Sequence, residues 1–151
     1  MSFAEIKRAT GEASIHMLKW RDTSRFVLVP SLGVIGIHEQ KDGVRLLTFY
    51  VQSYDSSTTA PGLAITNPFR GSLSTNLSFR NGTVSRKEVE AAFGLVMQGI
   101  TNGADFSNLP DKTKPFSVRG ETLHYPCLGL SFDLKNDNVE SVTVRKPQKF
   151  E

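Results

Sequence analysis

The sequence predicts an α+β fold in a single domain, residues 1–151: an antiparallel sheet of about six to eight strands with two short helices packed on one face. Three observations support it. Several short segments alternate apolar and polar side chains between turn residues, as antiparallel strands do. Two segments carry the pattern Ser-x-x-Glu that begins a helix. A chain of 151 residues is long enough to bury one core.

The first helix is expected close to the N-terminus. Ser2 and Glu5 form the capping pattern, and Gly11 supplies a stop. Residues 13–20 and 25–29 follow, and both are rich in β-branched, aromatic and aliphatic side chains. We therefore predict two strands after this helix.

A hairpin is the clearest feature of the first half of the chain. Residues 32–38 form an apolar run, residues 41–43 supply a turn, and residues 44–52 alternate in polarity. The polar segment 52–62 contains many turn residues, which predicts a mobile loop. A further strand is expected at residues 72–79.

The second helix is predicted at residues 86–93. Ser85 and Glu88 make a capping box, and Gly94 ends the helical pattern. With about two turns, such a helix needs tertiary packing to be stable.

A long loop and a closing hairpin complete the predicted elements. Residues 97–120 are rich in Gly, Asn, Pro, Asp and Lys, which predicts a loop of a length that is usually functional or disordered. Residues 128–134 and 139–144 are expected to pair across a turn at residues 136–138. The apolar positions change parity at residues 126–127, so a bulge or bend is expected there. No repeat of fixed period is evident.

Composition predicts a soluble, cytoplasmic protein. The N-terminus lacks the basic and apolar regions of a signal peptide, and no apolar run approaches the roughly 20 residues of a transmembrane segment. The single cysteine cannot form an intramolecular disulfide. The formal net charge of +3 arises from scattered basic residues. We interpret these as a mixed solvated surface and expect no nucleic-acid partner.

No pattern for catalysis, a metal or a cofactor is evident. His16, His38 and His124 are far apart in the sequence, and no Cys/His pair has zinc-site spacing. His124 and Cys127 are close enough to suggest a thiol nucleophile with a base. In an extended chain their side chains diverge, however, and Cys127 beside Pro126 is typical of a buried small hydrophobe. We therefore expect no enzymatic activity, and a hydrolase is the least favoured interpretation.

The remaining class of function is binding. We predict a non-enzymatic protein-interaction module, an adaptor or scaffold subunit of a cytosolic complex, whose contact surface uses loops 52–62 and 97–120. Lys112, Lys114 and Arg119 are the candidate contacts to an acidic partner or to anionic lipid. The alternative is a small immunity-type inhibitor that binds and neutralises a toxin, because such a protein needs only a shaped surface.

Several short segments also carry a resemblance. They are KDGVRLLTF at residues 41–49, a helix containing residues 89–94, LHY at residues 123–125 and GLSF at residues 129–132. Together these segments, within residues 40–146, resemble one module of the phagosome assembly factor family. The resemblance implies a non-enzymatic protein that pairs with a β-propeller partner and binds phosphoinositide on autophagic membranes. No binding residue of that family maps onto a defined motif here.

Overall fold

The computed structural model describes residues 4–5, 8, 15–55, 64–73, 76–99 and 111–149. Its elements are β1 (His16–Lys19), β2 (Ser24–Val29), η1 (Pro30–Leu32), β3 (Val34–Glu39), β4 (Gly43–Tyr50), β5 (Tyr54–Asp55), β6 (Ala64–Ile65), β7 (Ser72–Leu73), β8 (Leu77–Ser78), α2 (Arg86–Phe93), β9 (Met97–Gly99), β10 (Phe116–Val118), β11 (Thr122–Tyr125), η2 (Pro126–Leu128), β12 (Leu130–Lys135) and β13 (Asn138–Arg145).

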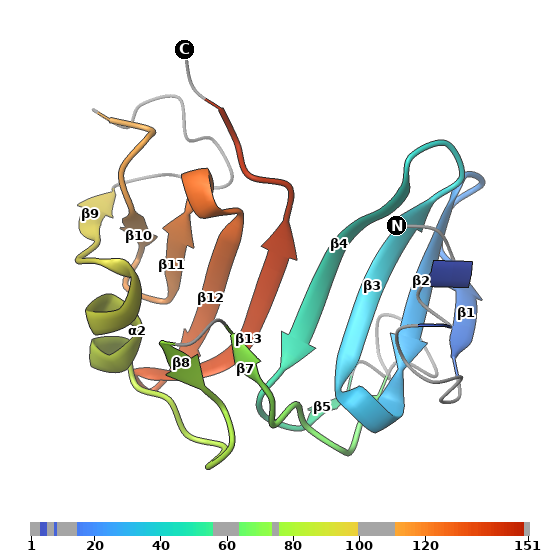
Figure 1. Cartoon of the computed structure of the whole chain (residues 1–151), viewed down its shortest axis with the longest axis horizontal. Helices are drawn as coiled ribbons and strands as arrows, with labels where there is room; N and C mark the ends of the chain where they lie inside the picture. The colour runs from blue at the N-terminus through green and yellow to red at the C-terminus, as the bar shows by residue number, and fades with distance from the viewer. Residues whose placement is uncertain are drawn as a thin grey trace.

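The fold is mostly β. Nine strands form one sheet in the order β1-β2-β3-β4-β13-β12-β11-β10-β9, as Figure 1 shows. Neighbouring strands pair antiparallel except β9 and β10, which are parallel. The short pairs β5-β6 and β7-β8 form two further sheets. The predicted antiparallel pairing is therefore largely confirmed.

The predicted α+β class is wrong. We expected two helices on six to eight strands, whereas the sheet has nine strands and α2 is the one α-helix whose bounds lie within the described residues. Of the predicted N-terminal helix, only residues 4, 5 and 8 are described, and they are helical. The predicted loop at residues 97–120 contributes β9 and β10. These three-residue strands are stabilised by pairing with neighbours, which local sequence patterns do not reveal.

The helix α2 has the predicted boundaries and cap. The backbone N–H of Ser85 donates to Glu88 Oε2 at 2.7 Å, and the Glu88 N–H donates to Ser85 Oγ at 3.3 Å. Gly94 follows the last turn with a φ of 105°. These reciprocal bonds satisfy N–H groups that a helix start otherwise leaves unpaired.

The sheet contains two copies of one strand arrangement, a duplication that was not predicted. We call β1 to β4 repeat 1 and β10 to β13 repeat 2. In each repeat a Pro-x-Leu-Gly turn, η1 with Gly33 or η2 with Gly129, reverses the second strand into the third. The two glycines have φ of 67° and 69°. The predicted bend at residues 126–127 is thus a complete chain reversal.

The bulges and the strand pairing confirm that the two repeats are equivalent. Each fourth strand carries one extra residue opposite the third strand, Arg45 in β4 and Glu140 in β13. The equivalent residues Thr48 and Thr143 lie directly opposite each other where β4 pairs with β13. Their hydroxyl oxygens are 3.0 Å apart. A pseudo-two-fold axis therefore passes between these threonines, and η1 and η2 lie at opposite ends of the sheet (Figure 1).

The first face of the sheet is the one that α2 covers in repeat 2. Val89 of α2, Phe132 and Val142 of the sheet and Phe79 after β8 all have 1% or less of their surface exposed. The Tyr125 hydroxyl donates to the Gly94 carbonyl at 2.8 Å and ties the end of α2 to β11. Burial raises the pKa of Tyr125 to about 12. This cluster is the larger core.

The second face differs between the repeats. In repeat 1, Leu28 and Ile35 pack with Ile65 of β6. In repeat 2 the equivalent positions carry His124 and Ser131, whose Nδ1 and Oγ atoms are 3.0 Å apart. This face is consequently apolar in one half of the sheet and polar in the other.

Candidate functional site

A basic cavity lies on the second face where β4 begins and β13 ends. Its volume is about 430 Å³. Both repeats contribute to it, because β4 belongs to the first and β13 to the second. We call it the basic pocket; its lining residues are Trp20, Arg21, Ile37, Glu39, Arg45, Leu46, Arg145, Lys146 and Gln148.

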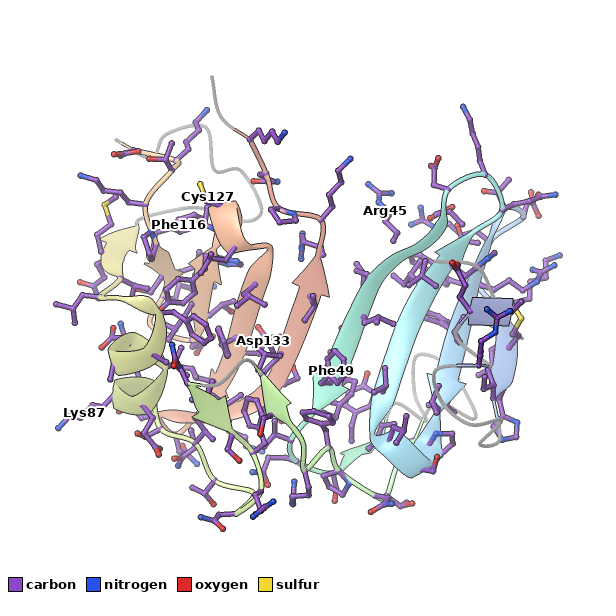
Figure 2. All side chains as sticks on the ribbon, viewed as in Figure 1. Arg45, Phe49, Lys87, Phe116, Cys127 and Asp133 are labelled. Atoms are coloured by element: carbon purple, nitrogen blue, oxygen red, sulfur yellow. The ribbon has the colours of Figure 1, made fainter. Side chains whose placement is uncertain are left out.

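The β4–β13 pairing brings three of the cationic side chains together. Arg45 is the bulged residue of β4, and Arg145 of β13 pairs with Leu46. Lys146 continues the chain directly after Arg145. A bulge changes the direction of a side chain relative to a regular strand. Figure 2 shows Arg45 projecting from β4 on the side that faces β13.

The turn between β1 and β2 supplies an aromatic wall. The Arg21 guanidinium lies 4.3 Å from the centre of the Trp20 ring, and Trp20 lies 5.0 Å from Phe26 between ring centres. The backbone N–H groups of Trp20 and Arg21 both donate to the carbonyl of Ser24, at 3.3 and 3.2 Å. Trp20 is still 42% exposed. The turn therefore presents a fixed aromatic surface with a stacked cation.

The electrostatics of the pocket favour an anion. None of Arg21, Arg45, Arg145 and Lys146 forms an ion pair with another residue in the described part of the chain. The one acidic side chain, Glu39, accepts a hydrogen bond from Ser24 Oγ at 2.8 Å. A cavity lined by one sign of charge concentrates ions of the opposite sign.

The predicted contact residues are divided between two ends of β10. Lys112 and Lys114 precede this strand and are exposed, with Lys114 Nζ 3.6 Å from Asp111 Oδ2. Arg119 follows the strand, is exposed, and has a φ of 51°. The structure therefore does not place Arg119 with the two lysines, and their binding role stays a prediction.

The two lysines lie at the same end of the sheet as the basic pocket. Between them, the carbonyl of Thr113 accepts from Cys127 Sγ at 3.3 Å. The neighbouring carbonyl of Pro126 accepts from the backbone N–H of Gln148, which lines the pocket, at 3.0 Å. The cations predicted from the sequence thus extend the charged end of the sheet. The predicted loops 52–62 and 97–120 lie in part outside the described residues.

His124 and Cys127 do not share a cavity. Burial lowers the pKa of His124, which lies on the second face beside Ser131. Cys127 is exposed, so its predicted burial is wrong. It lines a different cavity, of about 200 Å³, together with Phe93 and Tyr125. The nucleophile-and-base arrangement considered from the sequence is not assembled.

The described residues contain neither a metal-binding cluster nor a membrane-spanning helix. In this part of the chain, no group of three or more His, Cys, Asp or Glu side chains could hold a metal ion. Within the same residues, no helix is long and apolar enough to cross a membrane.

Sequence reasoning missed the residues that line the basic pocket. Trp20 was predicted to end a strand, Arg21 to be one of the scattered basic residues, and Arg45 to belong to a hairpin. Their convergence with Arg145 depends on the pairing of β4 with β13, which are far apart in the sequence. The available signal was a tryptophan followed by an arginine at a strand boundary.

Comparisons with known proteins provide no further assignment. No family model matches the chain, and neither a curated protein nor a solved structure matches it. The resemblance to the phagosome assembly factor family stays a prediction. The site is therefore interpreted from its own geometry and charge.

Proposed function

We propose that the protein is a non-enzymatic interaction module that binds an acidic segment of a partner protein in the basic pocket. The observation that carries this proposal is a cluster of four cations around the apolar side chains of Ile37 and Leu46, none of which forms an ion pair with another described residue. The net positive charge attracts an acidic segment, and the side chains of Ile37 and Leu46 provide an apolar surface against which the segment can be buried.

The lining predicts the chemistry of the bound segment. Arginine guanidinium groups bind carboxylates through two parallel hydrogen bonds, and Arg21, Arg45 and Arg145 supply three such groups. Trp20 is the kind of exposed aromatic residue that dominates binding energy at interfaces. A segment with Asp or Glu side chains around one apolar residue satisfies both parts of the pocket.

A concave site also favours a protein segment over a lipid surface. A side chain can enter a cavity, whereas a membrane surface is contacted mainly by exposed lysines such as Lys112 and Lys114. Anionic lipid is therefore the competing outcome to test. The toxin-neutralising inhibitor predicted as the alternative has no observation that favours it.

Fluorescence can test the proposal directly, because Trp20 is the single tryptophan of the chain. We expect an eight-residue peptide of alternating Glu and Leu to change Trp20 emission saturably. Arg45→Gln should weaken binding about tenfold, equivalent to about 1.4 kcal/mol. Arg80→Gln, an exposed position outside the pocket, is the matched control and should bind as the wild type does. Added salt should weaken binding.

Two outcomes would contradict the proposal. One is equal peptide affinity in Arg45→Gln and Arg80→Gln. The other is an absence of peptide binding together with sedimentation on vesicles containing phosphatidylserine that requires Lys112 and Lys114. That second result would assign the charged end of the sheet to lipid.

A further inference from the structure

A smaller cavity opens on the first face of repeat 1, on the side of the sheet opposite the basic pocket. Its volume is about 210 Å³. Arg25 and His38 are directly paired across β2 and β3 and both line it. We call it the Arg25 cavity; its lining residues are Met17, Asp22, Thr23, Arg25, His38 and Gln40.

The guanidinium of Arg25 is incompletely satisfied there. Its Nη1 atom is buried and has no hydrogen-bond partner within the described part of the chain. Buried donors are nearly always paired, with protein groups, water or a ligand, because an unpaired donor has lost its hydration without compensation. An acceptor placed in the cavity would remove this penalty.

The equivalent positions in repeat 2 carry different side chains. Glu121 and Leu134 take the positions of Arg25 and His38, and the Leu134 N–H donates to the Glu121 carbonyl at 2.7 Å. Leu134 is only 9% exposed and belongs to the larger core. The position of His38 is therefore filled by a core leucine in repeat 2, whereas in repeat 1 the ring of His38 lines a cavity.

We propose that the Arg25 cavity binds a small carboxylate. Arg25 Nη1 would donate to one carboxylate oxygen, and the His38 ring and the Gln40 amide are the further donors that line the site. The acidic lining residue, Asp22, has its Oδ1 atom 4.0 Å from Lys19 Nζ, and its side chain is fully exposed. It therefore leaves the buried guanidinium available. This proposal is independent of the function assigned to the basic pocket.

Proton NMR of the histidine rings provides the test, with sodium acetate as the probe and sodium chloride keeping the ionic strength constant. The chain has three histidines, so His16 and His124 serve as internal references. We expect His38 ring signals to shift saturably with acetate. Arg25→Gln should weaken the apparent affinity at least tenfold. Arg80→Gln, the same substitution at an exposed position outside both cavities, should leave it unchanged.

The proposal fails if the His38 signals of the wild-type protein do not saturate with acetate. It also fails if chloride alone produces the same shift, or if Arg25→Gln binds acetate as the wild type does. Arg25→Lys retains the charge and should weaken binding less than Arg25→Gln. A thermal melt checks that both variants fold, and the wild-type titration is decisive even if one does not.

Discussion

The two repeats share a backbone but differ in the side chains on both faces. On the first face, Phe132 of repeat 2 corresponds to Gly36 of repeat 1, and each pairs with the fourth strand of its own repeat. On the second face the polarity differs, since His124 occupies the position of Leu28. The second face is therefore apolar in repeat 1 and polar in repeat 2, whereas the buried Val27, Val29 and Val34 keep the first face of repeat 1 apolar as well. The two repeats have the same turns and bulges, because these features depend on backbone conformation and not on the polarity of the side chains on each face.

The difference extends to the two ends of the β4–β13 pair. Another cavity, as large as the basic pocket at about 430 Å³, lies at the opposite end of this strand pair. Neutral and polar side chains line it around Lys135 and Glu140. Glu140 is the counterpart of Arg45, and Lys135 is the counterpart of Glu39. The charges at equivalent positions are thus exchanged, and only one end is strongly basic.

Substitutions at Phe132 and Gly36 should give the largest difference in the free energy of unfolding between the two repeats. Phe132→Ala removes a fully buried ring and should lower the free energy of unfolding by about 3–5 kcal/mol. At Gly36 a Cβ would lie 2.8 Å from Leu47 Cδ2, so Gly36→Ala should cost only about 1 kcal/mol through local repacking. Urea unfolding measures both. Equal losses would show that the two first faces are packed alike.

The turn glycines should instead give equal effects. In Gly129→Ala the Cβ would collide with the Arg145 carbonyl, and in Gly33→Ala it would lie 2.5 Å from the Phe69 backbone nitrogen. Both positions have positive φ, so each substitution should destabilise by about 2–3 kcal/mol. Gly94→Ala, with positive φ but no atom within 4 Å of the new Cβ, is the control and should cost less. A large difference between the two turns would break their equivalence.

Local signals allowed some elements to be predicted. Ser85, Glu88 and Gly94 define both ends of α2 within ten residues of sequence. The turn before β13 was also predicted, and Asn136 and Asp137 adopt the positive φ that such a tight hairpin requires. In each case the signal and the structure it determines involve neighbouring residues.

The duplication and the basic pocket could not be predicted in this way. Around the turns, the repeats share a Pro, a Leu and a Gly, while the side chains on the second face differ in polarity, as His124 and Leu28 illustrate. The pocket needs Arg45 and Arg145 to become neighbours, which only the pairing of the fourth strands achieves. A sequence pattern specifies which side chains share a face but not which distant strand lies beside it.

Removal of the α2 cap should cause a smaller loss of stability, and this loss should be concentrated in repeat 2. Ser85→Ala removes the acceptor for the Glu88 N–H and should reduce stability by about 1 kcal/mol. Because α2 covers the first face of repeat 2, amide hydrogen exchange should accelerate in β11 and β12 more than in β2 and β3. Uniform acceleration would indicate that the sheet unfolds as one unit.

The threonine pair on the pseudo-two-fold axis tests the coupling of the repeats. Thr48→Val or Thr143→Val alone leaves one part-buried hydroxyl without its partner and should cost about 0.5–1 kcal/mol. The double variant removes both hydroxyls and should cost less than the sum of the single losses. Strictly additive losses in a double-mutant cycle would mean that this hydrogen bond contributes nothing to the junction.

The smallest expected loss of stability occurs at acid pH and arises on the polar second face of repeat 2. Burial lowers the pKa of His124 from its model-peptide value of 6.5, with Asp133 opposing and Arg145 reinforcing the shift. The unfolded chain therefore takes up a proton that the folded protein resists. Stability should be complete above pH 6.5 and should fall as the pH decreases below it.

Restoring the residues of repeat 1 should remove this dependence. The double substitution His124→Leu with Ser131→Ile recreates the Leu28–Ile35 pair and avoids leaving the Ser131 hydroxyl without its histidine. Urea unfolding at pH 5 and pH 8 should then show a smaller loss of stability at acid pH than in the wild type. His16→Gln, at an exposed position, is the control. An unchanged acid dependence in the double variant would mean that other groups control it, and that the polar second face of repeat 2 has no effect on the proton equilibrium.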